Sequence, residues 1–388
     1  MNKIDYVVTS TTKYIEQMTK AQRKKYGQFF TSKETAVFMA ELFDLQSASG
    51  TVSILDPGAG SGILSTALIE RMLDVAAITK IKLVCYESDT NILELLRSNM
   101  DWVCAHASKP IEYEIVADNY ILSQMADYNH MLWESPNPPK YDYVIGNPPY
   151  MKIPKDAPEA LAMPDVCYGA PNLYFIFASM SLFNLKSDGE MVYIIPRSWT
   201  SGAYFKKFRQ KFLDEGALEH IHLFVSRDKV FEKESVLQET IIIKVKKAKN
   251  KPQNVTITTT QSNADFSQKT VFHAPYDTVV NGKDQYVYLV TNAKEVETLE
   301  RLNRLPNTLP SIGLKMKTGL TVDFRNREAL RDHAEATAVP LFYSQHIKNG
   351  KVEFPIGKEH EYLVTEQNGL LQKNSNYLFV KRFTAKEE

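Results

Sequence analysis

The tetrapeptide Asn147-Pro148-Pro149-Tyr150 carries the clearest chemistry in this sequence. It follows the apolar run YDYVIG, a predicted buried strand, and so stands at a strand's carboxyl end, where open α/β sheets place their chemistry. The prolines fix the backbone and aim two acceptors, the Asn147 amide and the Pro148 carbonyl, in set directions. An amino group held between two such acceptors gains electron density on its nitrogen and becomes nucleophilic. The Tyr150 ring offers a flat face on which a planar ring can stack.

A second copy of the first three residues, Asn137-Pro138-Pro139, provides an internal control. It follows a polar loop and is succeeded by Lys140 instead of an aromatic residue, so we interpret it as a turn. The buried strand before Asn147 and the ring after it therefore distinguish the candidate site from a proline-rich turn.

A glycine-rich segment, Asp56-Pro57-Gly58-Ala59-Gly60-Ser61-Gly62, lies between an apolar strand pattern and an apolar helix pattern. Glycines in this place let a ligand approach backbone N–H groups. The spacing lacks the Gly-Lys-Ser/Thr of a P-loop and is a poor match to GxGxxG. Glu87, at the end of the next predicted strand, can accept hydrogen bonds from both hydroxyls of a ribose. Each feature alone also fits a tight turn or an exposed carboxylate, but together they predict a nucleoside-containing cofactor.

The predicted strands end at regular intervals along the chain. Asp56, Glu87, Asp118 and Asn147 follow one another at 31, 31 and 29 residues. One strand with its crossover helix takes about 30 residues. The regularity predicts an α/β fold with a parallel, doubly wound sheet covered on both faces.

Further elements flank this core. Residues 1–25 predict a polar helix, and Thr31 or Ser32 is the predicted N-cap of the helix that follows. Two apolar runs, Leu237–Val245 and Val255–Thr260, flank the polar turn KKAKNKPQN and predict a hairpin.

The pattern changes past about residue 295, where one helix precedes short strands separated by Gly and Pro. We therefore expect an N-terminal helical extension over 1–25, a catalytic domain over 26–294 and a further region over 295–388.

The composition is typical of a globular protein, and its positive and negative charges are equal in number. The 388 residues are 44% hydrophobic and 24% charged, with zero formal net charge. Residues 1–240 hold 24 basic and 30 acidic residues, a net of −6, whereas residues 241–388 hold 22 and 16, a net of +6. The last third is therefore the expected face for a polyanion.

Two groups of cations are candidates for phosphate contact, with a solvated basic face as the alternative. They are Lys206, Lys207, Arg209 and Lys211 on one predicted helix, and Lys244, Lys246, Lys247, Lys249 and Lys251 in the hairpin turn.

The cysteines argue against a metal centre and a disulfide framework. Cys85, Cys104 and Cys167 are widely spaced and form no CxxC or Cys/His cluster, which fits a reducing cytoplasm. The N-terminal residues lack the apolar core of a signal peptide, and no apolar run approaches the roughly 18 residues of a membrane span. We expect a cytoplasmic protein without a metal.

Four segments in this order, DPGAGSG, CYESD, VADNY and VIGNPPY, resemble those of S-adenosylmethionine-dependent N6-adenine DNA methyltransferases. YGQFFTS, ahead of the glycine loop, resembles the tenth motif of that family, and this order is typical of its γ class. NLYFIF, VYIIPRSWTSG and VFEKESVLQETIII resemble the fifth, sixth and eighth motifs. The resemblance covers about residues 26 to 245 and is closest to the Eco57I-like and TaqI-like branch of restriction–modification enzymes. Three later segments are more weakly similar to that branch's recognition region: Lys317-Thr318-Gly319-Leu320, Asp323-Phe324-Arg325 and YSQHIKNG.

This resemblance implies a fold and a set of partners. The fold would be a mostly parallel, seven-stranded Rossmann-like sheet with an antiparallel hairpin, followed by a C-terminal α+β recognition region. The substrate would be double-stranded DNA in a bacterial or archaeal cell, and the cofactor S-adenosylmethionine. Only about 25 residues precede YGQFFTS, too few for a nuclease domain, so a cognate endonuclease would be a separate partner. The chain ends about 90 residues into the recognition region, which implies a short or incomplete one.

The resemblance also implies roles for single residues. Thr31 and the Asp56 loop would contact the methionine end of the cofactor, Glu87 its ribose, and Asp118 its adenine, with Asn119 beside it. The Asp56 loop contributes Asp56, Pro57, Gly58, Gly60 and Gly62. The catalytic set would be Asn147, Pro148, Pro149 and Tyr150, with Asn147 also facing the cofactor. Tyr150 and Phe231 would stack on the two faces of a target adenine flipped out of the duplex.

Other functions use a similar site. A protein glutamine N5-methyltransferase also places NPPY around an amide nitrogen, but such enzymes end soon after the sheet, whereas about 140 residues follow Val245 here. An RNA methyltransferase is a further alternative, and a binding module with a degenerate site would not need the intact NPPY. Cytosine C5 methylation needs a thiolate, and the three cysteines lie outside the motifs.

Overall fold

The computed structural model describes residues 2–17, 31–130, 140–225 and 239–381. The chain divides into two compact units, Met1–Arg304 and Leu305–Glu388. The expected boundary between 294 and 295 falls in α11 (Ala293–Asn303), a helix that packs on elements of the first unit. The functional division into 26–294 and 295–388 stays a prediction.

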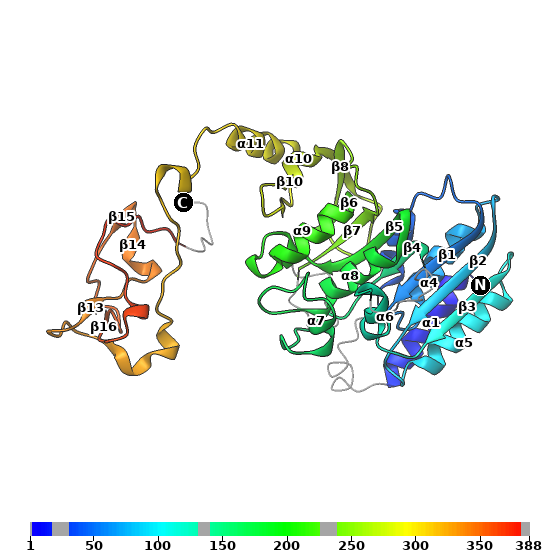
Figure 1. The fold of residues 1–388 in the computed structure, drawn as a ribbon, viewed down its shortest axis with the longest axis horizontal. Coiled ribbons are helices and arrows are strands. Elements are labelled where there is room, and N and C mark those ends of the chain that lie inside the picture. Colours follow the sequence, from blue (N-terminus) through cyan, green and yellow to red (C-terminus); the bar gives the residue numbers. More distant parts are fainter. Residues whose placement is uncertain (1, 18–30, 131–139, 226–238, 382–388) are drawn as a thin grey trace. The chain divides into compact units, whose positions relative to one another are not determined.

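A nine-stranded sheet forms the centre of the first unit, in the order β3-β2-β1-β4-β5-β7-β6-β8-β9 (Figure 1). The first five strands are parallel, whereas β7 is antiparallel to both β5 and β6. The chain runs outward from β1 to β3 and then returns to β4 on the other side of β1. This reversal creates a switch point between the carboxyl ends of β1 and β4, where ligands of doubly wound sheets bind. The strands are β1 (Gly50–Pro57), β2 (Ile78–Tyr86), β3 (Ile111–Val116), β4 (Tyr141–Gly146), β5 (Leu185–Pro196), β6 (Ala217–Phe224), β7 (Thr240–Lys246), β8 (Asn254–Thr260) and β9 (Thr270–Pro275).

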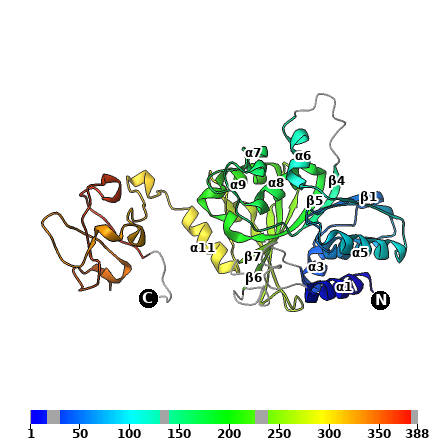
Figure 2. The same cartoon turned by 90° about the horizontal axis from the view of Figure 1, so that it is seen from below.

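Helices cover both faces of this sheet, as Figure 2 shows. One layer contains α1 (Lys3–Gln17), α3 (Lys33–Glu41), α4 (Ile63–Leu73) and α5 (Leu93–Ala105). The other contains α6 (Tyr120–Tyr128), α7 (Pro158–Ala162), α8 (Leu173–Asn184) and α9 (Lys206–Glu215). Each layer closes its own hydrophobic core, and β4 serves both, because Val144 faces one core while Tyr143 and Ile145 face the other. This double burial explains the nearly continuous apolar sequence of the central strands.

Local sequence signals account for where several helices begin. Ser32 is the N-cap of α3, and its hydroxyl accepts a hydrogen bond from the Thr35 amide at 3.2 Å, as predicted. Asn172 caps α8 in the same way, through the Tyr174 amide. The predicted N-terminal helix is present as α1, which packs on α4 and α5.

The predicted hairpin between Leu237–Val245 and Val255–Thr260 is wrong. Strands β7 and β8 lie in these segments, but β6 lies between them, antiparallel to β7 and parallel to β8. The antiparallel hairpin of the sheet is therefore β6–β7, and β8 and β9 extend the expected seven strands to nine.

Short elements complete the first unit. They are η1 (Arg197–Thr200), η2 (Ala203–Phe205), α10 (Tyr276–Val279), β10 (Val280–Asn281) and β11 (Tyr286–Val287). In the described part of the chain, no helix combines the length and apolarity needed to cross a membrane.

The second unit is built from two-residue strands and short 3-10 turns. Its strands are β12 (Leu330–Arg331), β13 (Val339–Pro340), β14 (Ile347–Lys348), β15 (Lys351–Val352) and β16 (Tyr362–Leu363). Its 3-10 turns are η3 (Pro310–Ile312), η4 (Asp323–Arg325), η5 (Arg327–Ala329), η6 (Ser344–His346) and η7 (Asn368–Leu370). The helix of the expected α+β region, α11, belongs to the first unit.

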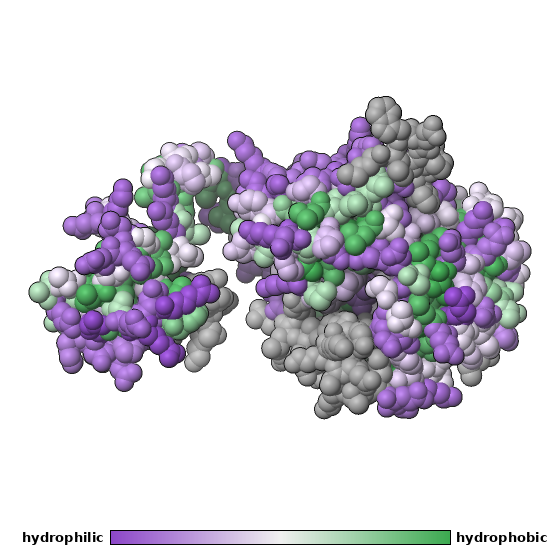
Figure 3. All heavy atoms as spheres, turned by 60° about the horizontal axis from the view of Figure 1, so that its bottom comes forward, coloured by the Kyte–Doolittle hydropathy of each residue, from purple (hydrophilic) through white to green (hydrophobic). Residues whose placement is uncertain are grey.

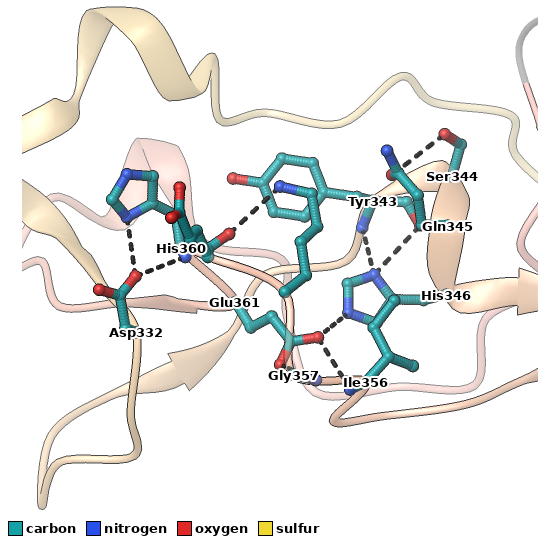
Figure 4. A network of polar contacts seen from close by, with 11 residues as sticks. Asp332, Tyr343, Ser344, Gln345, His346, Ile356, Gly357, His360 and Glu361 are labelled. Atoms are coloured by element: carbon teal, nitrogen blue, oxygen red, sulfur yellow. Dashed lines mark hydrogen bonds and ion pairs between the residues drawn. The ribbon is translucent and has the colours of Figure 1, made fainter.

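A buried polar pair lies at the centre of the second unit (Figure 4). His346 Nε2 donates to Glu361 Oε1 at 2.8 Å, and the Tyr343 amide donates to His346 Nδ1 at 2.9 Å. Burial opposes ionisation of Glu361, but hydrogen bonds from His346 and the backbone amides of 356 and 357 hold the pKa of its carboxyl below the ordinary value. Such a pair is stable only while every polar atom keeps its partner.

Apolar side chains of the second unit are mostly exposed. Among its described residues, only Leu330 and Leu363 are buried hydrophobic side chains, whereas Met316 and Leu378 are 87% and 92% exposed. On the face of this unit that Figure 3 displays, hydrophobic side chains lie scattered among hydrophilic ones. The unit thus offers apolar as well as polar groups to a binding partner.

Candidate active site

The sheet brings the predicted site residues to one edge. Pro57 pairs in register with Tyr86, and Tyr86 with Val116, so Asp56, Glu87 and Asp118 lie at or just past aligned strand ends. Asn147 directly follows β4, the other strand of the switch point. The prediction that these strand ends share an edge follows from the parallel register and is matched by the structure.

The Asn147 amide is held from both sides. Its Nδ2 donates to the Thr31 hydroxyl at 3.2 Å, and its Oδ1 accepts from the Tyr150 hydroxyl at 2.7 Å. Thr31 lies 116 residues earlier in the chain, just before the cap of α3. Both contacts run through hydroxyl groups, which can donate as well as accept, and together they hold the plane of the amide at the end of β4.

The Tyr150 side chain is anchored by its hydroxyl. The Oη atom also lies 3.0 Å from the Ile194 carbonyl oxygen of β5, so one proton faces two acceptors. The Tyr174 ring meets the Tyr150 ring edge-on, with centroids 6.4 Å apart and an interplanar angle of 88°. Burial raises the pKa of Tyr150, which keeps the hydroxyl neutral and a donor.

Neither Ile194 nor Tyr174 was singled out from the sequence. Tyr174 lies in NLYFIF, and Ile194 in VYIIPRSWTSG, so both stand in segments that resemble family motifs. A backbone carbonyl such as that of Ile194 leaves no residue-type signal. Resemblance to the motif was the only indication available.

Two glycines of the glycine loop have different surroundings. A Cβ on Gly62, which has φ of +84°, would lie 2.6 Å from the Met100 methyl group, so this glycine lets α4 pack on α5. A Cβ on Gly60, which has φ of +56°, would meet nothing within 4 Å. The backbone at Gly60 is therefore open to a ligand, whereas Gly62 serves the fold.

Asp56 is a fully buried carboxyl group with one free oxygen. Its Oδ2 accepts from the Ser65 hydroxyl at 2.6 Å, and Oδ1 has no hydrogen-bond partner among the described residues. Desolvation raises the pKa of Asp56 to about 7, with a further contribution from the nearby Glu87 carboxylate. A donor or a cation of a bound ligand would satisfy this oxygen.

Glu87 holds the glycine loop in this structure. Its Oε2 accepts from the Gly60 amide at 2.9 Å and its Oε1 from the Asp89 amide at 2.8 Å. Burial raises the pKa of Glu87, while the backbone donors oppose that shift. Each carboxylate oxygen keeps a lone pair for the predicted ribose hydroxyls.

The side chains of Asp118 and Asn119 differ in how far they are already engaged in hydrogen bonds within the protein. Asp118 is exposed, and among the described residues its Oδ1 accepts from the amide of Asn119, at 2.6 Å. The Asn119 Oδ1 caps α6 by accepting from the amides of Ile121 and Leu122, and its Nδ2 donates to Glu159 Oε1 at 2.7 Å. Asn119 therefore has a structural role as the cap of α6, beside its predicted place next to the cofactor.

The remaining predicted site residues are divided between described and undescribed parts. Pro148 is buried and Pro149 half-buried, directly after Asn147. Phe231, predicted to stack on the target base, lies outside the described residues, as does the control copy Asn137-Pro138-Pro139. Among the residues that the structure covers, no group of three or more His, Cys, Asp or Glu could hold a metal ion.

The lysine-rich turn after β7 does not face this site. Since β7 is antiparallel to β5, with Lys246 opposite Glu190, the turn lies at the amino-terminal edge of the parallel strands. Lys244 pairs with Glu190 at 2.9 Å, and Lys247 donates to the Phe183 carbonyl at 2.7 Å. Lys251 likewise donates to main-chain carbonyls. The turn thus lies at the edge opposite the site, and phosphate contact by its lysines stays a prediction.

The basic helix is also tied into the fold. Arg209 is fully buried and donates to the carbonyls of Trp199 and Gly202. Lys206 pairs with Asp284 at 2.7 Å, and Lys211 with Asp165 at 3.3 Å. These cations stabilise contacts between elements, and the structure favours the fold over DNA phosphate as their partner.

Comparisons with known proteins identify the family of this chain. The family model described as Eco57I restriction-modification methylase matches residues 73–231. The type II methyltransferase M.PstI of Providencia stuartii is 35% identical over 94% of this chain and 72% of its own length. M.BsuBI of Bacillus subtilis is 32% identical over 94% of this chain and 73% of its own length.

A solved structure from a type I restriction–modification system shares the fold. It has a TM-score of 0.51 at 14% identity, over 71% of this chain and 63% of the other. The fold and the sequence similarity agree with each other. The chain therefore belongs to the type II DNA methyltransferases of restriction–modification systems, with S-adenosylmethionine as the methyl donor.

Proposed function

We propose that this methyltransferase modifies N6 of adenine in double-stranded DNA. The observation that carries the proposal is the orientation of the Asn147 amide, with Nδ2 on Thr31 and Oδ1 toward Tyr150. That oxygen and the neighbouring Pro148 carbonyl would accept the two hydrogens of an exocyclic amino group. The amino nitrogen would thereby gain the electron density that attack on a methyl group needs.

The cofactor side of the site fits S-adenosylmethionine, which supplies a methyl group on a positively charged sulfur. Buried Asp56 Oδ1 without a partner suits a donor or cation, and the open backbone at Gly60 permits close approach. We assign Thr31 and the glycine loop (Asp56, Pro57, Gly58, Gly60 and Gly62) to the methionine end. Glu87 and exposed Asp118 are assigned to ribose and adenine, and the side chain of Asn119 acts by holding the turn at 118–119.

A thiolate mechanism has no candidate residue in this chain. Burial raises the pKa of Cys104 and of Cys167 to about 11, and that of Cys85 well above its ordinary value. All three therefore remain thiols at neutral pH. This supports transfer to an amino nitrogen over C5 methylation of cytosine.

The target base must leave the duplex to reach Asn147, at a cost of a few kcal/mol. Stacking on an aromatic face contributes roughly 1–3 kcal/mol and can offset that cost. We assign the Tyr150 ring to one face of the extruded adenine and Phe231 to the other. The hydroxyl anchor of Tyr150 supports this role, since a fixed ring loses little entropy when the base arrives.

Target recognition is assigned to residues 295–388, and a separate cognate endonuclease is proposed as a partner. Charge alone does not carry this assignment. Leu305–Glu388 holds 12 basic and 10 acidic residues, a net of +2, while residues 241–294 hold 8 and 3, a net of +5. The second unit would therefore select sequence by base contacts more than by attraction to phosphate.

One experiment tests the proposal directly. Unmethylated plasmid DNA is incubated with the enzyme and methyl-labelled cofactor. The DNA is then digested to nucleosides, which are separated and identified by mass spectrometry. The expected product is N6-methyl-2′-deoxyadenosine, formed at a defined set of sites in the DNA. Label in N4-methylcytosine or in RNA added in parallel would contradict the assignment of the target base.

A further inference from the structure

The 151–172 loop (Met151 to Asn172) starts directly after Tyr150 and returns to its own base. The Ile153 amide donates to the Pro171 carbonyl at 3.0 Å, and the Leu173 amide to the Met151 carbonyl at 2.9 Å. The closed base fixes the loop next to the catalytic tetrapeptide. Whatever moves the loop therefore acts close to Tyr150.

One helix, α6, holds the far part of this loop. Asn129 Nδ2 donates to the Ala162 carbonyl at 2.9 Å, and the Tyr128 hydroxyl donates to Asp165 Oδ2 at 2.7 Å. At the other end of α6, Asn119 Nδ2 donates to Glu159 Oε1 at 2.7 Å. Three apolar side chains of this part of the loop, Ala162, Met163 and Val166, are buried, whereas Leu161 is exposed. The loop is thus a packed part of the site with three polar attachments to α6.

The Asn119–Glu159 contact differs from the other two because of its position in the site. Asn119 directly follows Asp118, and its main-chain amide donates to the Asp118 carboxylate at 2.6 Å. The same side chain caps α6 with its oxygen while its nitrogen binds Glu159. One amide group thus joins the Glu159 carboxylate to the cap of α6 and to the turn at 118–119. A charge-assisted hydrogen bond is stronger than a neutral one.

We propose that Glu159 is a positioning residue that couples the cofactor's adenine pocket to the 151–172 loop. Cofactor bound at Asp118 would order the turn at 118–119, and the Asn119–Glu159 contact would pass that order to the loop beside Tyr150. The coupling rests on the proposed role of Asp118 in holding the cofactor. It works in both directions, so a ligand that orders the loop strengthens cofactor binding by the same factor.

Hydrogen exchange on the full chain tests this coupling, with S-adenosylhomocysteine as the added ligand. Amides inside the loop that carry hydrogen bonds, such as those of Leu161 and Val166, report its local opening. In the unaltered protein the ligand should slow their exchange about tenfold, the size expected from one charge-assisted hydrogen bond. In Glu159→Ala this slowing should disappear, while ligand affinity changes less than about threefold.

Two matched variants separate coupling from general damage. Glu159→Gln keeps an oxygen that accepts a neutral hydrogen bond from Asn119 and should retain part of the slowing. Asp156→Ala removes an exposed carboxylate three residues earlier in the same loop and should retain all of it. Equal slowing in Glu159→Ala and the unaltered protein would overturn the proposal.

The glycine loop distinguishes failure of the coupling from failure of the site assignment. Its amides at Gly60 and Gly62 should be protected by the ligand in every variant. Protection there without protection of the 151–172 loop in the unaltered protein overturns the coupling alone. No protection at either place overturns the cofactor assignment, and the coupling with it.

Discussion

The Tyr150 hydroxyl donates a hydrogen bond of 2.7 Å to the amide oxygen of Asn147, the group that we assign to the target amino nitrogen. The same hydroxyl lies 3.0 Å from the Ile194 carbonyl, so the tetrapeptide is connected to the neighbouring strand β5. With Thr31 on the amide nitrogen, the catalytic group is oriented without any substrate. Groups oriented in advance cost no reorganisation at the moment of reaction.

This relationship predicts that Tyr150 has two separable functions. Tyr150→Phe removes the hydroxyl and keeps the ring, so kcat should fall about tenfold, as expected from a lost hydrogen bond of about 1.4 kcal/mol. Base extrusion, followed as the fluorescence rise of 2-aminopurine at the target position, should persist. Tyr150→Ala should lose both. A Tyr150→Phe enzyme with unchanged kcat would show that the hydroxyl does not orient Asn147.

Cofactor binding and chemistry should separate by mutation. Glu87→Ala and Asp118→Ala each remove an acceptor from the cofactor's nucleoside and should weaken binding by about tenfold. Asn147→Ala should bind the cofactor nearly normally and lose turnover, because the amino group is no longer polarised. Calorimetry and single-turnover rates measure the two effects, and normal cofactor affinity in Asp118→Ala would contradict its assignment.

The stability of the protein should depend on the pH through Asp56. Its pKa is about 7 in the folded state against 3.8 when unperturbed, so the folded state binds more protons and stability falls as the pH rises from about 4 to 7. Asp56→Asn lacks this titration and keeps an oxygen for Ser65. Relative to the unaltered protein, the variant should gain about 2 kcal/mol between pH 5.5 and pH 8. Urea unfolding at both pH values measures it, and an equal difference at both would refute the shift.

Phe231 provides the second stacking face in our proposal. Phe231→Ala should reduce the 2-aminopurine signal and weaken binding of DNA with a flipped base, since one stacking contact contributes roughly 1–3 kcal/mol. Phe231→Tyr keeps the ring and serves as the control. A full signal and full turnover in Phe231→Ala would remove this residue from the site.

A fragment ending at Arg304 should separate cofactor binding from target selection. The cut follows α11, because that helix packs on the first unit, and leaves the nine-stranded sheet complete. The fragment should bind S-adenosylhomocysteine and lose site-specific methylation. Circular dichroism establishes that it is folded. A folded fragment that methylates the same sites at a comparable rate would place target selection within the first unit.

The sequence by itself determined the parallel core and which residues line its active edge. Regular spacing of Asp56, Glu87, Asp118 and Asn147 was sufficient, because carboxyl ends of parallel strands with crossover helices must meet at one edge. The cap at Ser32 was also local, since a cap and its helix amide are three residues apart.

Only the tertiary structure decided what each group at that edge contacts. Thr31 and Asn147 meet across 116 residues, and Asn119 meets Glu159 across 40, and no local pattern encodes such pairs. The direction of β7 determines where the lysine-rich turn lies. Because β7 is antiparallel to β5, the turn that follows it lies at the edge of the sheet opposite the site. Periodicity reports whether a strand is buried but not which neighbour it pairs with, and so the pairing of β7 with β6 had to come from the fold.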